Sequence, residues 1–153
     1  MKLTFVDAGV LIAASRGGTE QAARAMEILD DPEREFAASI FLRLEVLPQA
    51  LFNKREAEVA FYEAFFSAVS KWATDLEAIS EAALREASTY GVEAMDALHV
   101  AAAAALGAAE LVTIEKPSRS IHRARSVKSR RSPRARMEVT SWGHLSWSWL
   151  RST

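Results

Sequence analysis

The sequence predicts an α/β fold, a three-layer α/β/α sandwich around a mostly parallel sheet of four to five strands. Short runs rich in β-branched and aromatic residues alternate with longer segments that have helical apolar spacing. Of the 153 residues, 50% are hydrophobic and 25% are charged, which is typical of a globular protein with a real core. Two apolar runs also close on an acidic residue where a strand would leave the sheet. Strands separated by helices favour this architecture over an all-β or all-α one.

Five segments are expected to be strands. The first, KLTFV at residues 2–6, ends at Asp7, and the second is EFAAS at residues 35–39. The other three are expected near residues 72–76, at ELVTI (110–114) and at MEVTSW (137–142). Helical segments between the strands imply that the crossovers place most strands parallel to one another.

Helices are predicted in the intervals between these strands. One starts directly after Asp7, Thr19 is a possible N-cap for residues 19–30, and Ser39 could cap the helix that carries Glu45. Further helices are expected at residues 55–71, 80–89 and 94–106, the last two stopped by Gly91 and Gly107.

Length and residue content narrow the class of protein. A chain of 153 residues suits one domain. Without cysteine, disulfides and thiolate metal sites are excluded, and the composition suits a reducing cytoplasm. The first apolar stretch is broken too early for a signal peptide, and the run at residues 100–109 is too short to cross a bilayer. We therefore expect a cytoplasmic protein with no membrane partner.

Charge is distributed very unevenly along the chain. Residues 1–115 carry 9 Lys/Arg and 19 Asp/Glu, a net charge of −10, whereas residues 116–136 carry 9 Lys/Arg and no acid, a net charge of +9. A basic segment on an acidic body indicates contact with a polyanion. The same composition also fits a solvated loop with little to bury, and the two interpretations are compatible if the segment orders on binding.

Four acids interrupt or close segments that otherwise look buried: Asp7, Glu45, Asp96 and Glu115. Burial of a charge is costly unless it is compensated, so four such acids call for a shared explanation. Asp7 and Glu115 are expected at the carboxyl ends of strands, where ligands gather in open α/β sheets. Glu45 and Asp96 are expected on helices whose first turns could face the same crevice. The separations of 38, 51 and 19 residues mean that folding must bring the four together.

The succession VDAGVLIA, SIFLRLEVL, MDALHVAAA and LVTIEKP resembles a PIN domain over roughly residues 2–121. It is most similar to the toxin ribonucleases of bacterial toxin–antitoxin pairs, the VapC type. The resemblance implies that Asp7, Glu45, Asp96 and Glu115 form a metal-binding acidic cluster that cleaves RNA. Products with 5′-phosphate and 3′-hydroxyl ends, a cognate antitoxin and a homodimer are further implications. The fourth acid is often Asp in the family, so Glu115 within TIE is a departure from the pattern.

The residue types at these positions suit one kind of metal chemistry. Carboxylate oxygens without Cys or His favour Mg²⁺ or Mn²⁺ over zinc. Two carboxylates about 5 Å apart repel each other by roughly 3 kcal/mol at an effective dielectric constant near 20. We therefore expect raised pKa values in the metal-free protein and stabilisation when a divalent cation binds.

Each candidate residue also has a purely structural interpretation. Asp7 and Asp96 could cap helices, Glu45 could face solvent or form an ion pair, and Glu115 could be an exposed strand end. Thr113 is a candidate hydrogen-bond donor to a ligand carboxylate, and Ser39 is either a supporting residue or a plain N-cap. His99, one helical turn after Asp96, is expected to be a structural histidine with satisfied hydrogen bonds.

The domain is predicted to span residues 1–141, with a Trp-rich tail at 142–153. Residues 118–136 form either an exposed basic loop before MEVTSW, which the pattern favours, or an irregular final-strand region, which the resemblance favours. The tail could stack on bases, but packing against the body or a partner is the preferred interpretation. The expected RNA-binding residues are Arg119, Arg123, Arg125, Lys128, Arg130 and Arg131, which would attract phosphates.

Three functions therefore remain open. The first is a metal-dependent endoribonuclease, the toxin of a toxin–antitoxin pair. The second is a non-catalytic RNA- or antitoxin-binding module on the same fold, and the third is a metal-dependent phosphohydrolase on small phosphate esters. Four retained acids favour the first over the second, and the extended basic segment favours it over the third.

Overall fold

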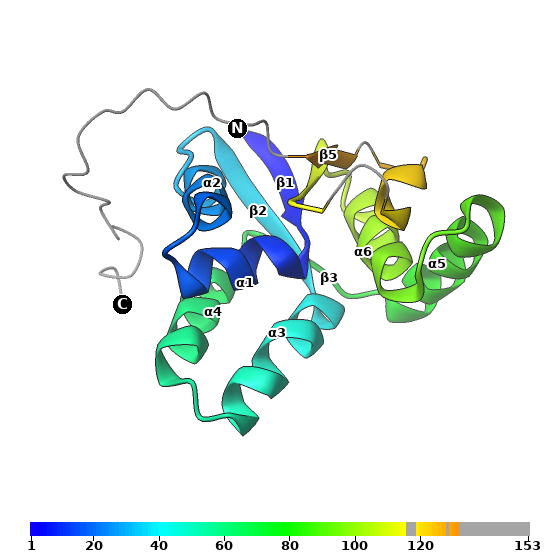
Figure 1. The fold of residues 1–153 in the computed structure, drawn as a ribbon. Coiled ribbons are helices and arrows are strands. Elements are labelled where there is room, and N and C mark those ends of the chain that lie inside the picture. Colours follow the sequence, from blue (N-terminus) through cyan, green and yellow to red (C-terminus); the bar gives the residue numbers. More distant parts are fainter. Residues whose placement is uncertain (116–118, 128, 132–153) are drawn as a thin grey trace.

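The computed structural model describes residues 1–115, 119–127 and 129–131, in which strands and helices alternate (Figure 1). The strands are β1 (Lys2–Val6), β2 (Arg34–Ser39), β3 (Lys71–Ala73), β4 (Glu110–Thr113) and β5 (Ser129–Arg131). The helices are α1 (Ala8–Arg16), α2 (Glu20–Leu29), α3 (Ile40–Phe52), α4 (Glu56–Ala68), α5 (Leu76–Tyr90), α6 (Ala94–Ala105) and the 3-10 helix η1 (Ser120–Arg123). Within these described ranges, no helix is long and apolar enough to cross a membrane.

The five strands form one sheet in the order β3-β2-β1-β4-β5, and every neighbouring pair is parallel. The chain builds outward from β1 on one side and then returns to add β4 and β5 on the other. The strand order therefore reverses between β1 and β4, and the crevice outside their carboxyl ends is the usual ligand site of such sheets. The predicted fold class is confirmed.

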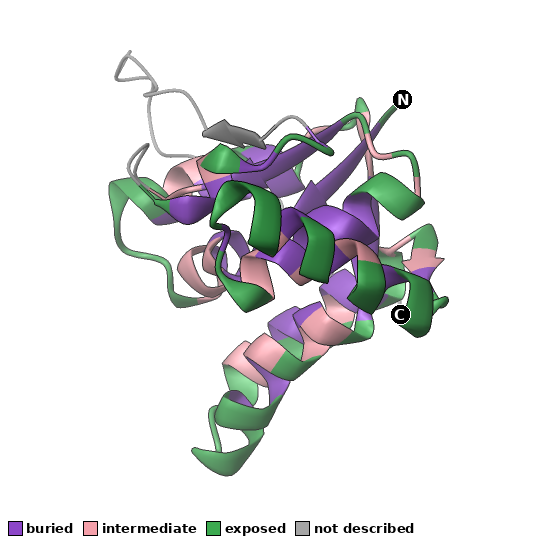
Figure 2. Ribbon diagram, turned by 90° about the vertical axis from the view of Figure 1, so that its right-hand side faces the viewer, coloured by how far each residue is buried: buried purple, intermediate pink, exposed green. Residues whose placement is uncertain are grey.

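Helices cover both faces of the sheet (Figure 1). Helix α6 packs across β1 to β4 with α5 against its outer side, and α1 covers the opposite face together with α2 and α4. Because both faces are covered, the central strands β1 and β4 are buried almost throughout: Phe5, Val6 and Leu111 have no exposed surface. The α3–α4 hairpin projects away from the sheet, and its far end is exposed (Figure 2).

Two predicted boundaries near the middle of the chain were wrong. The helix expected at residues 80–89 begins at Leu76, because the Asp75 side chain accepts a hydrogen bond from the Ala78 amide and caps it. That cap also ends β3 at Ala73, so the strand expected at residues 72–76 is shorter and lies earlier. By contrast, Thr19 caps α2 as predicted, accepting from the Ala22 amide.

Of the two interpretations of residues 118–136, the described part fits the irregular final-strand region and not the exposed basic loop. Residues 120–123 form η1 and residues 129–131 form β5, which pairs with β4. Ile121, Ala124 and Val127 recur every third residue and are buried in the core, so the segment has more to bury than its charge suggested. The strand predicted at 137–142 and the tail at 142–153 lie outside the described residues.

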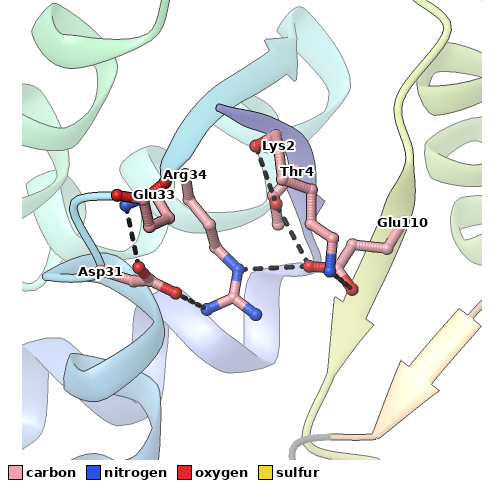
Figure 3. A network of polar contacts seen from close by, with 6 residues as sticks. All are labelled: Lys2, Thr4, Asp31, Glu33, Arg34 and Glu110. Atoms are coloured by element: carbon pink, nitrogen blue, oxygen red, sulfur yellow. Dashed lines mark hydrogen bonds and ion pairs between the residues drawn. The ribbon is translucent and has the colours of Figure 1, made fainter.

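A buried carboxylate joins the amino ends of three strands (Figure 3). Glu110, only 1% exposed, lies 3.3 Å from Lys2 Nζ and 3.2 Å from Arg34 Nε, and it accepts a hydrogen bond from the Thr4 hydroxyl. Arg34 in turn pairs with Asp31. These ion pairs compensate the buried charge, so Glu110, an acid that our sequence analysis did not single out, has a structural explanation.

Candidate functional site

Asp7 lies directly after β1, at the point where the strand order reverses. Its main-chain amide bonds the Val112 carbonyl of β4, and its Oδ1 accepts from the Val10 amide at 3.1 Å, capping α1. The side chain also bonds the Thr113 hydroxyl at the end of β4. Asp7 is thus held by both central strands, in the crevice that the topology predicts.

Burial raises the pKa of Asp7 to about 6, although the hydrogen bonds from Thr113 and Val10 oppose the shift. The charge of Glu115 raises this pKa further, so the two carboxylates are close enough to repel. A Cβ placed on Gly9 would lie 3.3 Å from Asp7 Oδ1 and 3.4 Å from Ile114 Cγ1. Glycine at position 9 therefore leaves space beside the carboxylate.

Asp96 lies in the first turn of α6, whereas the structural interpretation of this residue was that it caps the helix. The N-cap is Glu93 instead, and Asp96 Oδ2 accepts a hydrogen bond from Ser120 Oγ at 3.1 Å. Burial raises the pKa of the Asp96 carboxyl, Ser120 opposes the rise, and the charges of Glu93 and Glu45 add to it. Asp96 therefore lies near two further acids, Glu93 and then Glu45, whose charges repel its own.

Glu45 lies on α3. Its Oε1 is 2.9 Å from Nε2 of His99, whose side chain is 1% exposed against 27% for Glu45. His99 acts electrostatically on both Asp7 and Asp96, lowering the pKa of each, so the imidazole lies near both carboxylates. Its Nδ1 is buried and makes no hydrogen bond within the described residues, so the predicted satisfied histidine is satisfied on one side of the ring.

Glu115 is the least enclosed of the four acids. It lies two residues after β4, and its amide donates to Thr113 Oγ1 at 3.0 Å. Its side chain is 44% exposed and lies 3.6 Å from Arg119 Nε, while Arg119 also approaches Glu93 at 3.8 Å. Thr113 thus contacts both Asp7 and the backbone of Glu115.

Ser39 ends β2 and precedes α3. It occupies the N-cap position, yet its hydroxyl caps nothing; the Oγ is buried and has no partner among the described side chains and backbone. The predicted plain N-cap role therefore does not hold for this side chain.

The four acids have the donor atoms that a hard divalent cation prefers, but their carboxylates are not gathered around one point. All donors are carboxylate oxygens, as Mg²⁺ and Mn²⁺ prefer. Across residues 1–115, 119–127 and 129–131, no three His, Asp or Glu side chains are gathered closely enough to hold a metal. Instead, the charge of Glu115 repels that of Asp7, and the charges of Glu93 and Glu45 repel that of Asp96. A shared cation would require these carboxylates to move toward one another.

A comparison with protein families matches residues 4–116 to the PIN domain, a range that contains all four acids. The chain belongs to the PIN domain family. PIN domains are generally nucleases and typically depend on divalent metals. The resemblance predicted from the four motifs is confirmed.

A solved structure supports the fold of this PIN domain. The chain is similar to the crystal structure of VapBC2 from Rickettsia felis bound to a DNA fragment from their promoter. The TM-score is 0.63 at 14% sequence identity, covering 84% of this chain and 98% of that chain. The comparison with curated proteins gave no significant match.

The basic residues beyond the matched range have different roles in this PIN domain. Arg119 is 52% exposed and lies beside the acids, and Arg125 is also exposed. Arg123, predicted to bind RNA, donates to the carbonyls of Tyr90 and Gly91 at the end of α5. Lys128 lies outside the described residues, and Arg130 and Arg131 belong to β5.

Sequence reasoning missed Ser120, whose hydroxyl bonds Asp96. It also undervalued His99, which contacts Glu45. A usable signal existed for His99, because it is a polar residue one helical turn after Asp96 in a helix whose other residues are apolar. For Ser120 there was none, since three other serines follow within twelve residues.

Proposed function

We propose that this PIN domain is a metal-dependent endoribonuclease that hydrolyses RNA phosphodiester bonds. The observation that carries the proposal is a pair of aspartates, the buried Asp7 after β1 and the half-buried Asp96 on α6. Each has a raised pKa and a glutamate close enough to raise it further. Repelling carboxylates at a strand-order reversal are unfavourable alone and are relieved by a divalent cation.

The candidate residues would have two roles, holding the metal and orienting the carboxylates that hold it. Asp7, Asp96, Glu45 and Glu115 would hold Mg²⁺ or Mn²⁺ through carboxylate oxygens, with Thr113 fixing the Asp7 carboxylate. When bound, such a cation makes a water molecule more acidic and neutralises charge on a phosphate. Orientation of the carboxylates is the contribution of the chain itself, through the Val10 amide at Asp7 and the imidazole of His99 at Glu45.

Binding of the RNA backbone is assigned to the basic segment. Two of its exposed arginines are Arg119, which lies 3.6 Å from Glu115, and Arg125; both would contact phosphates rather than bases. We expect RNA affinity to fall steeply with added salt and to depend little on sequence. Arg123 contributes by fixing the segment to α5, rather than by a free guanidinium.

The deciding experiment is cleavage of labelled RNA by the purified full chain, free of any partner, with Mg²⁺, Mn²⁺ or EDTA. Asp7→Asn is compared with Asp75→Asn, which makes the same chemical change at another helix N-cap far along the chain. Asn caps helices about as well as Asp, so both variants should fold. Metal-dependent cleavage lost only in Asp7→Asn supports the proposal.

The second candidate function is a non-catalytic RNA-binding module on the same fold. It is favoured by the half-exposed Glu115, whose carboxylate forms an ion pair with Arg119. Metal-independent RNA binding without cleavage in any variant would establish it and refute the nuclease. Hydrolysis of a small phosphate ester at a rate unaffected by excess RNA would favour the phosphohydrolase instead.

We further propose that the nuclease is the toxin of a toxin–antitoxin pair, acts in the cytoplasm and forms a homodimer. The similarity to the VapBC2 structure, which was solved with promoter DNA, supports a protein partner that binds DNA. Co-expression with the product of any small neighbouring reading frame tests this idea. Failure of the two proteins to co-purify, with growth unaffected by this chain alone, would contradict it.

A further inference from the structure

The segment of residues 119–127 is built into the protein beside the acidic site. Ile121 is fully buried, and Ala124 and Val127 are each 7% exposed, so apolar burial fixes its path. Polar contacts add to this: Glu86 of α5 accepts from the amides of Arg125 and Ser126 and from the Ser126 hydroxyl. Residues 119–127 are therefore held in place against the core and α5, and their first residues contact Asp96 and Glu115.

Ser120 connects this segment to Asp96. Its hydroxyl donates to Asp96 Oδ2 at 3.1 Å and accepts from the main-chain amide of Glu93 at 3.0 Å. Because Ser120 is 7% exposed, water competes little for either bond. The accepted bond from Glu93 fixes the direction in which the Ser120 proton points, which is toward Asp96. Among the described residues the Asp96 carboxylate has no other hydrogen bond, so its Oδ1 is left for a ligand.

We propose that Ser120 is a positioning residue that orients Asp96 for the metal, an inference that rests on the proposed function. The family match ends at residue 116, so this serine belongs to the part of the chain beyond it. Side chains that hydrogen-bond a metal ligand typically change metal affinity or activity about 10- to 100-fold when removed. Ser120 thereby makes the geometry of Asp96 depend on the basic segment that we assign to RNA.

The test compares Ser120→Ala with Ser126→Ala in the full chain. Both remove a serine hydroxyl that donates to a carboxylate, and both loosen the same segment, but only Ser120 contacts Asp96. The first readout is the Mn²⁺ concentration that gives half of the thermal stabilisation, measured without RNA. The second is the Mg²⁺ concentration that supports half-maximal RNA cleavage.

We expect Ser120→Ala to raise both metal midpoints about 10-fold or more, while Ser126→Ala stays close to the unmodified protein. Ser120→Thr, which keeps the hydroxyl, should restore much of the loss. If Ser120→Ala does not fold, Ser120→Cys replaces it, because a thiol is a weak donor of similar size.

Equal midpoints in the two alanine variants would overturn the inference and leave Ser120 with a structural role. A native chain that responds to Mn²⁺ and cleaves RNA, with Ser120→Ala unchanged, would also overturn it while the proposed function stands. A native chain that shows neither metal response nor cleavage would refute the proposed function itself.

Discussion

His99 Nε2 lies 2.9 Å from Glu45 Oε1, and this contact joins α6 to α3 across the candidate site. The imidazole is almost fully buried and its ring centroid is 5.8 Å from that of Phe5, whereas Glu45 is partly open to solvent. Since a carboxylate can only accept, Nε2 is the donor. The buried ring therefore fixes the direction of a half-open carboxylate.

Replacement of His99 tests whether this direction matters. We expect His99→Leu to weaken metal-supported cleavage about 10-fold and to cost roughly 1 kcal/mol of unfolding free energy. His99→Gln keeps an N–H donor near the Nε2 position and should retain more activity than His99→Leu. Urea unfolding and Mg²⁺ titration of cleavage measure the two effects. Loss of stability without any change in the Mg²⁺ midpoint would make the contact structural.

Asp7→Asn should stabilise the metal-free protein at neutral pH. The folded-state pKa of about 6 lies above the ordinary value of 3.8, so the native state binds the Asp7 proton more tightly than the unfolded state does. This contribution to stability is complete below pH 3.8 and is lost as the pH rises through about 6. Asn carries no charge that must be buried, so at neutral pH the metal-free Asp7→Asn variant should be about 2–3 kcal/mol more stable than the unmodified protein. Asn can still cap α1.

The measurement is urea unfolding in EDTA across this pH range, with Asp75→Asn as the matched cap variant. Asp75→Asn should change little, because the Asp75 side chain is exposed. Added Mn²⁺ should stabilise the unmodified protein and leave Asp7→Asn nearly unchanged. Equal stability of Asp7→Asn and the unmodified protein at neutral pH would contradict the burial cost assigned to Asp7.

Gly9→Ala should separate stability from activity. Alanine is favoured in helices by up to about 1 kcal/mol over glycine, which offsets crowding by the new methyl group. That methyl would lie 3.3 Å from Asp7 Oδ1, so the carboxylate must shift by a few tenths of an ångström. We expect a near-native melting temperature with reduced kcat, and a larger loss of kcat for Gly9→Val. Full activity of both variants would show that the space beside Asp7 is not needed.

Glu110→Gln should lower stability without changing metal binding or cleavage. Glu110 is the first residue of β4, and the candidate site lies past the last residue of that strand. Burial alone would raise the pKa of Glu110, but hydrogen bonds from Arg34 and Lys2 hold it below its ordinary value. The charged form thus stabilises the fold above the unfolded-state pKa, and this stabilisation is lost as the pH falls.

We expect a cost of about 1–3 kcal/mol at neutral pH that shrinks in acid. Unfolding curves at two pH values, together with the Mg²⁺ midpoint of the folded variant, check both parts. A shifted Mg²⁺ midpoint would mean that the two ends of the sheet are coupled.

Local patterns were enough to predict most of the fold. The apolar strands at residues 2–6 and 110–114, the Thr19 cap and the stops at Gly91 and Gly107 depend on neighbours a few residues away. The start of α5 was not predicted, and the strand β5 falls in the irregular final-strand region that the resemblance, but not the residue pattern, favoured. The first was decided by the Asp75 side chain, and the second by pairing with β4 and by burial of Ile121 and Val127.

The sequence by itself determined the order of the strands and helices and the positions of four acids along them. Apolar periodicity and strand ends depend on residues that are close together in the chain. Tertiary structure alone decided which charges act on one another: Glu115 on Asp7, Glu93 and Glu45 on Asp96, and the Lys2 and Arg34 side chains on Glu110. It also brought Ser120 to Asp96. Such contacts join residues far apart in the chain, and their energies depend on burial and distance, which exist only once the sheet has formed.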